Sequence, residues 1–143
     1  MEKLSSHELT ALVNRVFEPT SEDRALAILV DLPDEALPDN PGWAARREMA
    51  WDWAQALQRA KGELAMDVDF YVYRNVQTNN ADLPETAWLH THGDLPATAD
   101  DIEDKEKISF SSLLAAHGIV IAPTQLSATA PLKIAARDGT FRA

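Results

Sequence analysis

Hydrophobic residues follow two different patterns along the chain, and these patterns alternate. Residues 25–32 and 118–123 are almost continuously apolar, which is typical of strands covered on both faces of a parallel sheet. Residues 66–76 place apolar side chains at alternate positions and predict a further strand. Between the strands, apolar residues recur every three or four positions, which is the spacing of an amphipathic helix.

The ends of several predicted helices carry residues that satisfy free backbone groups. Ser5 and Glu8 form a capping-box pattern at the start of a first helix, which we expect to end before Pro19. Asn40 followed by Pro41 predicts the start of a long helix. Gly62 is its expected end. Further helices are expected at about residues 100–107, 111–117 and 129–137.

The alternation of strands and helices predicts a fold class. Strands that follow one another through helical crossovers pair in parallel. We therefore expect residues 1–143 to form a single α/β domain of three layers, Rossmann-like in the broad sense, with a mostly parallel sheet. Residues 77–107 interrupt this order and are interpreted as an acidic, irregular insertion.

The last residues of the chain predict the start of one more strand. Gly139 follows the last predicted helix, and residues 140–142 have the pattern of another extended segment. This order predicts that residues 1–143 are the N-terminal part of a longer protein.

Composition narrows the class of protein. An apolar fraction of 45% and four Trp residues argue against disorder, and the absence of Cys excludes disulfides. No apolar run approaches the length of a membrane span, so we expect a cytoplasmic protein with no membrane partner. Trp43, Trp51 and Trp53 crowd one predicted helix. Trp53 fits its buried face. Either of the others is a candidate for an exposed interface with a further domain or a second subunit of a homodimer, and the alternative is simple packing against the neighbouring loop.

Charge excludes one class of partner. The net charge is −10, whereas nucleic-acid binding requires Lys and Arg to neutralise phosphates, so no nucleic-acid partner is expected. Residues 81–106 carry eight acids and one base, Lys105. The acids are Asp82, Glu85, Asp94, Asp100, Asp101, Glu103, Asp104 and Glu106. Such a run is typical of a solvated face.

A His-x-His pair is the sharpest candidate for metal chemistry. In an extended segment, His90 and His92 point the same way and can offer two imidazoles to one divalent metal, with Asp94 or Asp101 completing the site. With Thr98, the pattern faintly resembles JAMM-type metalloproteases, although that family has Ser where Thr98 stands. The alternative is a loop with two surface histidines.

A second candidate site follows the strand at 118–123. Thr124, Ser127 and Thr129 lie between its carboxyl end and the start of a helix, where open α/β sheets collect ligands and free amides attract small anions. The alternative is that Ser127 or Thr129 caps the helix. The chain has no Gly-rich phosphate loop, so conventional NAD or ATP binding is not expected.

Residues 118–143 resemble part of the N-terminal domain of aminopeptidase T-type metallo-aminopeptidases. The shared features are a strand, a Ser-x-Thr turn, a short helix with a basic residue and alanines, and a Gly and an Arg that lead into a strand. These places are filled by Ser127, Thr129, Ala135, Ala136, Gly139 and Arg142. The family often has His inside the turn, where this chain has Ala128.

The resemblance implies a division of labour. In that family the paired divalent metals and their ligands belong to the C-terminal domain, so no position here inherits a catalytic role. The resemblance therefore implies an accessory domain with no catalytic residue and no cofactor of its own. Its partner is then the C-terminal catalytic domain, and any divalent metal belongs to the parent protein.

Overall fold

The computed structural model describes residues 4–102, 105–139 and 141–143. The described helices are α1 (Ser6–Phe17), α2 (Pro41–Arg59), α3 (Lys61–Leu64), the 3-10 helix η1 (Ala99–Asp101), α4 (Phe110–Ala116) and α5 (Thr129–Asp138). The strands are β1 (Ala25–Leu32), β2 (Asp67–Arg74), β3 (Thr86–His90), β4 (Glu106–Ser109) and β5 (Ile119–Ile121). Among these helices, none is both long enough and apolar enough to cross a membrane.

The strands form one five-stranded sheet in the order β4-β3-β2-β1-β5. β1 pairs in parallel with β2 and with β5, and β3 pairs antiparallel with β2 and β4. The sheet is therefore mixed, with a parallel centre, rather than mostly parallel as the sequence pattern predicts. An isolated parallel bridge between Ile119 and Arg142 adds the end of the chain to the outer side of β5.

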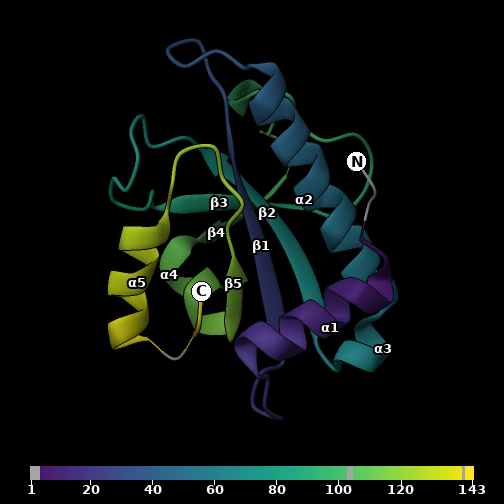
Figure 1. Ribbon diagram of the computed structural model, residues 1–143. Coiled ribbons are helices and arrows are strands. Elements are labelled where there is room, and N and C mark those ends of the chain that lie inside the picture. Colours follow the sequence, from purple (N-terminus) through teal and green to yellow (C-terminus); the bar gives the residue numbers. More distant parts are fainter. Residues whose placement is uncertain (1–3, 103–104, 140) are drawn as a thin grey trace.

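Helices cover both faces of the sheet, and the α/β class is confirmed (Figure 1). α1, α2 and α3 lie on one face, over the side chains of Leu26, Ile28 and Val30 of β1. α4 and α5 lie on the other, over Ala27 and Leu29. Because both faces are buried, β1 needs apolar residues at successive positions, which explains its continuous hydrophobic run.

The region 77–107 contains more regular structure than its sequence pattern predicts. β3 lies within it, pairing with β2 through Phe70 and His90. The expected charged helix at about 100–107 is wrong, because the chain forms only the short η1 and then enters β4 at Glu106. Residues 103 and 104 of that expected helix lie outside the described residues. Short strands near polar loops give a weak pattern, and pairing with a neighbouring strand decides their conformation.

All three Trp residues of α2 are at least partly buried. Trp43 is only 3% exposed, and its indole Nε1 donates to the Asp31 carbonyl (3.0 Å). Trp51 and Trp53 are partly buried against the core. α2 ends at Arg59, before the expected stop at Gly62. The buried tryptophan is therefore Trp43, and it fixes the start of α2 to the carboxyl end of β1.

Candidate functional site

The loop between β5 and α5 is held at the carboxyl end of the sheet by one buried carboxylate. Asp31, 1% exposed at the end of β1, accepts hydrogen bonds from the amides of Gln125 (2.8 Å) and Leu126 (2.9 Å). The side-chain hydroxyl of Thr124 donates to the Leu126 carbonyl (2.7 Å). Arg46 of α2 donates to the Thr124 carbonyl (3.0 Å). These contacts fix the β5–α5 loop to β1 through Asp31 and to α2 through Arg46.

The environment of Asp31 opposes its charge. Burial raises the pKa of the Asp31 carboxyl above its usual value, and the amides of Leu126 and Gln125 reduce that increase without cancelling it. Nearby Tyr73 is 1% exposed, and burial together with the charge of Asp31 raises its pKa as well. Both groups face the structured loop, so their polar atoms support the fold at this edge.

The start of α5 is capped by residues from a distant segment. Asn79 accepts from the Ser127 amide (2.9 Å), and Asn80 accepts from the Ala130 amide (3.0 Å) and the Ser127 hydroxyl (3.2 Å). The Asn80 amide donates in turn to the Ser127 carbonyl (2.7 Å). Asn80 has a φ of 58°, in the left-handed region that Asn tolerates better than most residues.

These contacts bear on the anion-binding hypothesis for Thr124, Ser127 and Thr129. Thr124 and Ser127 lie in the loop between β5 and α5, and Thr129 is the first residue of α5. Their neighbouring amides, however, already have acceptors within the chain: the Ser127 hydroxyl accepts from the Thr129 amide (3.3 Å), and the other acceptors are Asp31, Asn79 and Asn80. An anion at this edge has to displace them. Ala128 at the N-cap position makes no side-chain bond to the helix, and the acceptor for the Ala130 amide comes from Asn80.

His90 lies in the core rather than at an open site. It is 1% exposed, and its ring contacts the ring of Trp51 edge to face at a centroid distance of 4.6 Å. Its Nδ1 is 2.7 Å from the ammonium of Lys105, which can only donate, so Nδ1 accepts and the proton sits on Nε2. Nε2 is buried and has no hydrogen-bond partner among the described residues.

The surroundings of His90 favour its neutral form. Burial lowers the pKa of the imidazole, and the positive charge of Lys105 lowers it further. The Gly93 carbonyl acts in the opposite direction but does not reach a hydrogen bond to Nε2.

The other residues of the proposed metal site are not gathered around His90. β3 ends at His90, and the chain then turns through Gly93 at a φ of 82°. His92, Asp94 and Asp101 are all exposed. The hydroxyl of Thr91 lies 2.8 Å from Nδ1 of His92. In the described part of the chain, no three His, Asp or Glu side chains lie close enough together to hold a metal ion.

A second buried histidine is part of the scaffold. His117, 3% exposed at the end of α4, has Nδ1 2.7 Å from the Leu113 carbonyl and Nε2 2.8 Å from the Asp69 carboxylate. Both ring nitrogens therefore face acceptors, and neither is free to take a proton from a substrate. The pair joins α4 to β2.

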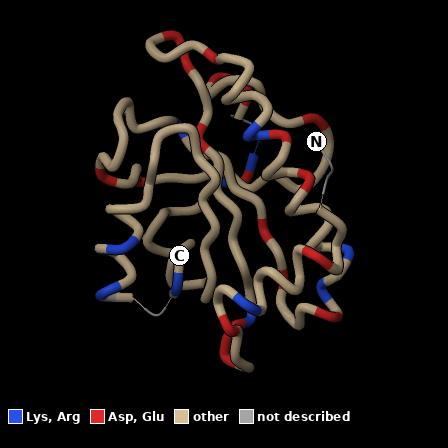
Figure 2. The backbone as a smooth tube through the Cα atoms, in the orientation of Figure 1, with Lys and Arg blue, Asp and Glu red and all other residues tan. Residues whose placement is uncertain are grey.

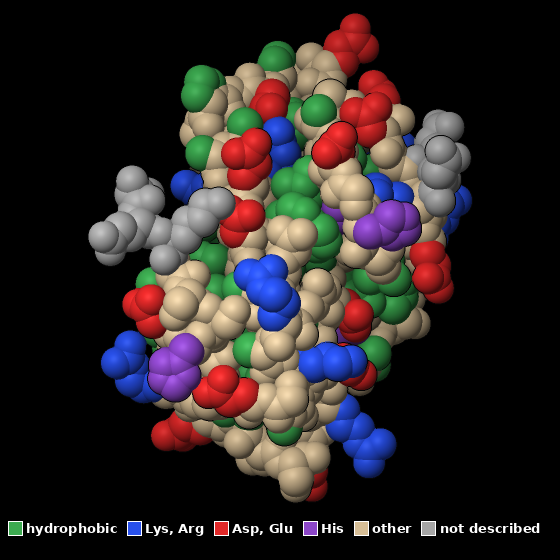
Figure 3. Space-filling view, turned by 90° about the vertical axis from the view of Figure 1, so that its right-hand side faces the viewer, with side chains coloured by type: hydrophobic (Ala, Val, Ile, Leu, Met, Phe, Trp, Pro, Cys, Tyr) green, Lys and Arg blue, Asp and Glu red, His purple; other side chains and the backbone are tan. Residues whose placement is uncertain are grey.

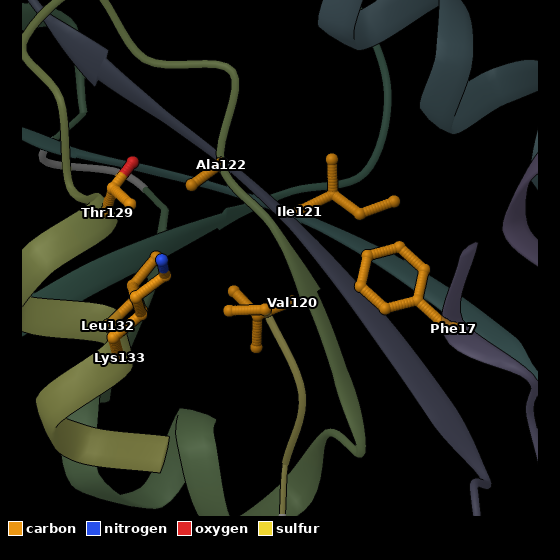
Figure 4. Close-up of a pocket in the computed structure, with 8 residues that line it drawn as sticks. Phe17, Val120, Ile121, Ala122, Thr129, Leu132 and Lys133 are labelled. Carbon is orange, nitrogen blue, oxygen red and sulfur yellow. The ribbon is translucent and has the colours of Figure 1, made fainter. Parts of the chain in front are cut away.

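A groove runs along the outer side of β5 and has a volume of about 230 Å³. Val120 and Ile121 of β5 and the following Ala122 form its floor. Figure 4 shows Phe17 of α1 on one side of the strand, and Leu132 and Lys133 of α5 on the other. No sequence motif marks this groove, because its walls come from segments far apart in the chain.

A larger hollow, of about 840 Å³, lies along the outer side of α2. Met49 and Trp53 contribute apolar surface, and Arg46, Glu48 and Arg59 contribute charge. Figure 3 views the side of the molecule that carries α1, α2 and α3, and it shows hydrophobic side chains gathered between charged ones. Nothing in its lining favours one chemical class of ligand over another.

Sequence reasoning missed the residues that organise the carboxyl edge. Asp31 lies inside an apolar run, and Asn79 and Asn80 lie in a polar segment interpreted as irregular. One signal in the sequence points to Asp31: it is an acidic residue near the end of a strand whose other residues are apolar. A charge buried there requires partners. Comparisons of the chain with protein-family models, with curated proteins and with solved structures found no match.

Proposed function

We propose that this chain is a non-catalytic accessory domain of an aminopeptidase-like metalloenzyme and that it acts through its surfaces. The observation that carries the proposal is the outer side of β5. Among the described residues, Arg142 alone is paired there, through Ile119, and an apolar groove continues along the strand beyond that pair. An edge of this kind is a surface on which another polypeptide segment can pack.

The use of polar groups at the carboxyl edge supports an accessory role. In α/β proteins this edge is the usual place for ligands. Here the carboxylate of Asp31 and the side-chain oxygens of Asn79 and Asn80 bind amides of the β5–α5 loop. Polar groups that hold a loop in place stabilise the surface that the loop presents.

The resemblance of residues 118–143 to the aminopeptidase T-type N-terminal domain supplies the proposed partner. It covers β5, the Ser-x-Thr turn and α5, which are the elements that border the groove. The partner is accordingly the catalytic domain, which binds the divalent metals and carries out the hydrolysis. This chain contributes assembly or gating.

A peptidase assay tests the proposal. The protein that contains this sequence is purified from its source cells and assayed with aminoacyl-p-nitroanilides, with and without a metal chelator. We expect chelator-sensitive activity in that sample and none in the isolated chain. Activity in the isolated chain, or no activity in the native sample, would contradict the proposal.

The alternative function is a metal-dependent hydrolase that uses His90 and His92. The observation that favours it is Nε2 of His90, which has no partner among the described residues and can bind a metal once it loses its proton. Zinc titration distinguishes it from the accessory role. Stoichiometric zinc binding that is lost in His92→Ala would support the hydrolase. The accessory role predicts the same weak zinc response from both proteins, since the exposed His92 ring and the buried His90 ring lie in different environments.

A further inference from the structure

The two edges of the sheet differ in their chemistry. β4 forms one edge, and its residues Glu106 and Lys107 are exposed, which discourages pairing with another strand. β5 forms the other edge with Val120 and Ile121. Exposed hydrophobic side chains occur on both helices that flank it: Val16 of α1 is 61% exposed and Ile134 of α5 is 59% exposed. The β5 edge is therefore the apolar one.

The backbone of β5 is already used for parallel pairing at its first residues. The Arg142 amide donates to the Gly118 carbonyl (2.8 Å), and the Val120 amide donates to the Arg142 carbonyl (2.7 Å). In a parallel ladder, alternate residues direct both N–H and C=O to the same side. The Val120 carbonyl and the Ala122 amide consequently face the same edge as this pair, one step further along β5.

We propose that the groove beside β5 binds an extended strand of the partner domain, added in parallel to β5, in line with Phe141 and Arg142 and beyond Ala143. The inference rests on the proposed function, because it names the contact through which the partner docks. The strand accepts a hydrogen bond from the Ala122 amide and donates one to the Val120 carbonyl. It brings a sixth strand into the sheet, between the ends of α1 and α5.

Side-chain alternation specifies the chemistry of that strand. Phe141 packs among the residues beneath α4 and α5, whereas Arg142 turns to the other side, where its guanidinium binds Asp23 and the Phe17 carbonyl. A strand in line with them thus alternates between the α5 side and the α1 side. Its residue on the α1 side faces Phe17 and is apolar.

The residue on the α5 side meets a positive charge. Lys133 lines the groove, is exposed, and forms no ion pair among the described residues. Figure 2 shows Lys and Arg on α5, while acidic residues lie along many other parts of a chain whose net charge is −10. The docking strand therefore carries an acidic side chain on this side, opposite the positive charge of Lys133.

Amide exchange in chains extended after Ala143 tests the proposal. The probe is the full chain with the tail Val-Thr-Val-Glu, which places a strand-forming segment next to the groove at high effective concentration. In the inferred register, the first added residue both donates to Val120 and accepts from Ala122. We expect exchange of the Ala122 amide to slow by at least about tenfold relative to the chain without a tail.

Moving one proline along the tail provides the matched control. Proline at the first added position removes the N–H that the register directs to Val120, so the tail Pro-Thr-Val-Glu should leave exchange of the Ala122 amide unchanged. Proline at the second position points its missing N–H away from β5, so Val-Pro-Val-Glu should retain the slowed exchange. Equal exchange of Ala122 with all three tails would overturn the proposal.

The charge of Lys133 is tested in the same system. Lys133→Glu should weaken protection of Ala122 by the acidic tail, and replacing the tail's Glu by Lys should restore it. If protection of the Ala122 amide is the same whatever the sign of these two charges, the docking strand does not require an acidic side chain. Protection of Ala122 without peptidase activity in the native sample would refute the proposed function and retain the strand site. Peptidase activity without protection of Ala122 would retain the proposed function and refute the strand site.

Discussion

The Asp31 carboxylate binds two backbone amides that lie 94 and 95 positions further along the sequence. It binds the amides of Gln125 and Leu126 although burial raises its pKa. A charged group is retained in such a place only when it has fixed partners, because an unpaired buried charge is very costly. At the scale of single residues, this carboxylate determines the shape of the β5–α5 loop.

Asp31→Asn tests this role. The amide group of Asn keeps one acceptor but presents N–H donors to the second backbone amide, so we expect the free energy of unfolding to fall by about 1–3 kcal/mol. The measurement is urea unfolding followed by Trp fluorescence. Asp34→Asn, at a half-buried position in the loop after β1, is the control and should have a smaller effect.

The raised pKa of Asp31 also predicts the sign of a pH effect. Between the unfolded value of 3.8 and the higher folded value, the folded state binds more protons than the unfolded state. This carboxyl therefore stabilises the fold most below pH 3.8, and its contribution is lost as pH rises through the folded pKa. Asp31→Asn should lack that component, and an unchanged pH profile would contradict the assignment.

For His90 we expect the opposite dependence of stability on pH. Its pKa is lowered in the folded protein, so the unfolded state binds the additional proton when pH falls below 6.5. The wild-type protein should lose stability on acidification through this range, by at most about 1.4 kcal/mol per pH unit. His90→Leu should reduce this loss and His92→Ala should retain it. Unfolding midpoints measured above and below pH 6.5 provide the comparison.

At the scale of elements, the sequence predicts those parts that carry their own local pattern. β1, β2, β5, α1 and α5 lie where the periodicity places them, and the Ser5–Glu8 capping box is formed. β3 and β4 are short strands whose conformation depends on pairing with β2 and with each other. No local pattern encodes that pairing, so the sequence does not reveal them.

The candidate sites follow the same distinction. Thr124 and Ser127 lie in the β5–α5 loop and Thr129 begins α5, and the binding of an anion by these three residues stays a prediction. Asn79 and Asn80, which bind Ser127, lie 48 and 47 positions away from it. For the His-x-His pair, the expected common direction requires one strand through both residues, and β3 ends at His90.

The capping of α5 by Asn80 is tested by a matched pair of substitutions. Asn80→Gly accommodates the φ of 58° but removes the side-chain oxygen, so it should destabilise the protein by about 1 kcal/mol. Asn80→Asp keeps the acceptors and adds a negative charge near the helix start, so it should preserve stability. Equal losses in thermal unfolding would show that the oxygen is not the important group.

At the scale of the whole molecule, charge and edge chemistry distinguish one surface. The chain has a net charge of −10, and the β5 edge combines an apolar groove with the exposed cation of Lys133. The opposite edge is protected by charged residues of β4. The proposed strand therefore adds at the β5 edge and not at the β4 edge.

The central claim is that this domain works as part of a larger metallo-aminopeptidase-like polypeptide. The most direct test is the intact mass, by mass spectrometry under denaturing conditions, of the protein that carries this sequence in its source cells. The account predicts a mass well above the 15.8 kDa of this chain. A mass of 15.8 kDa would contradict it.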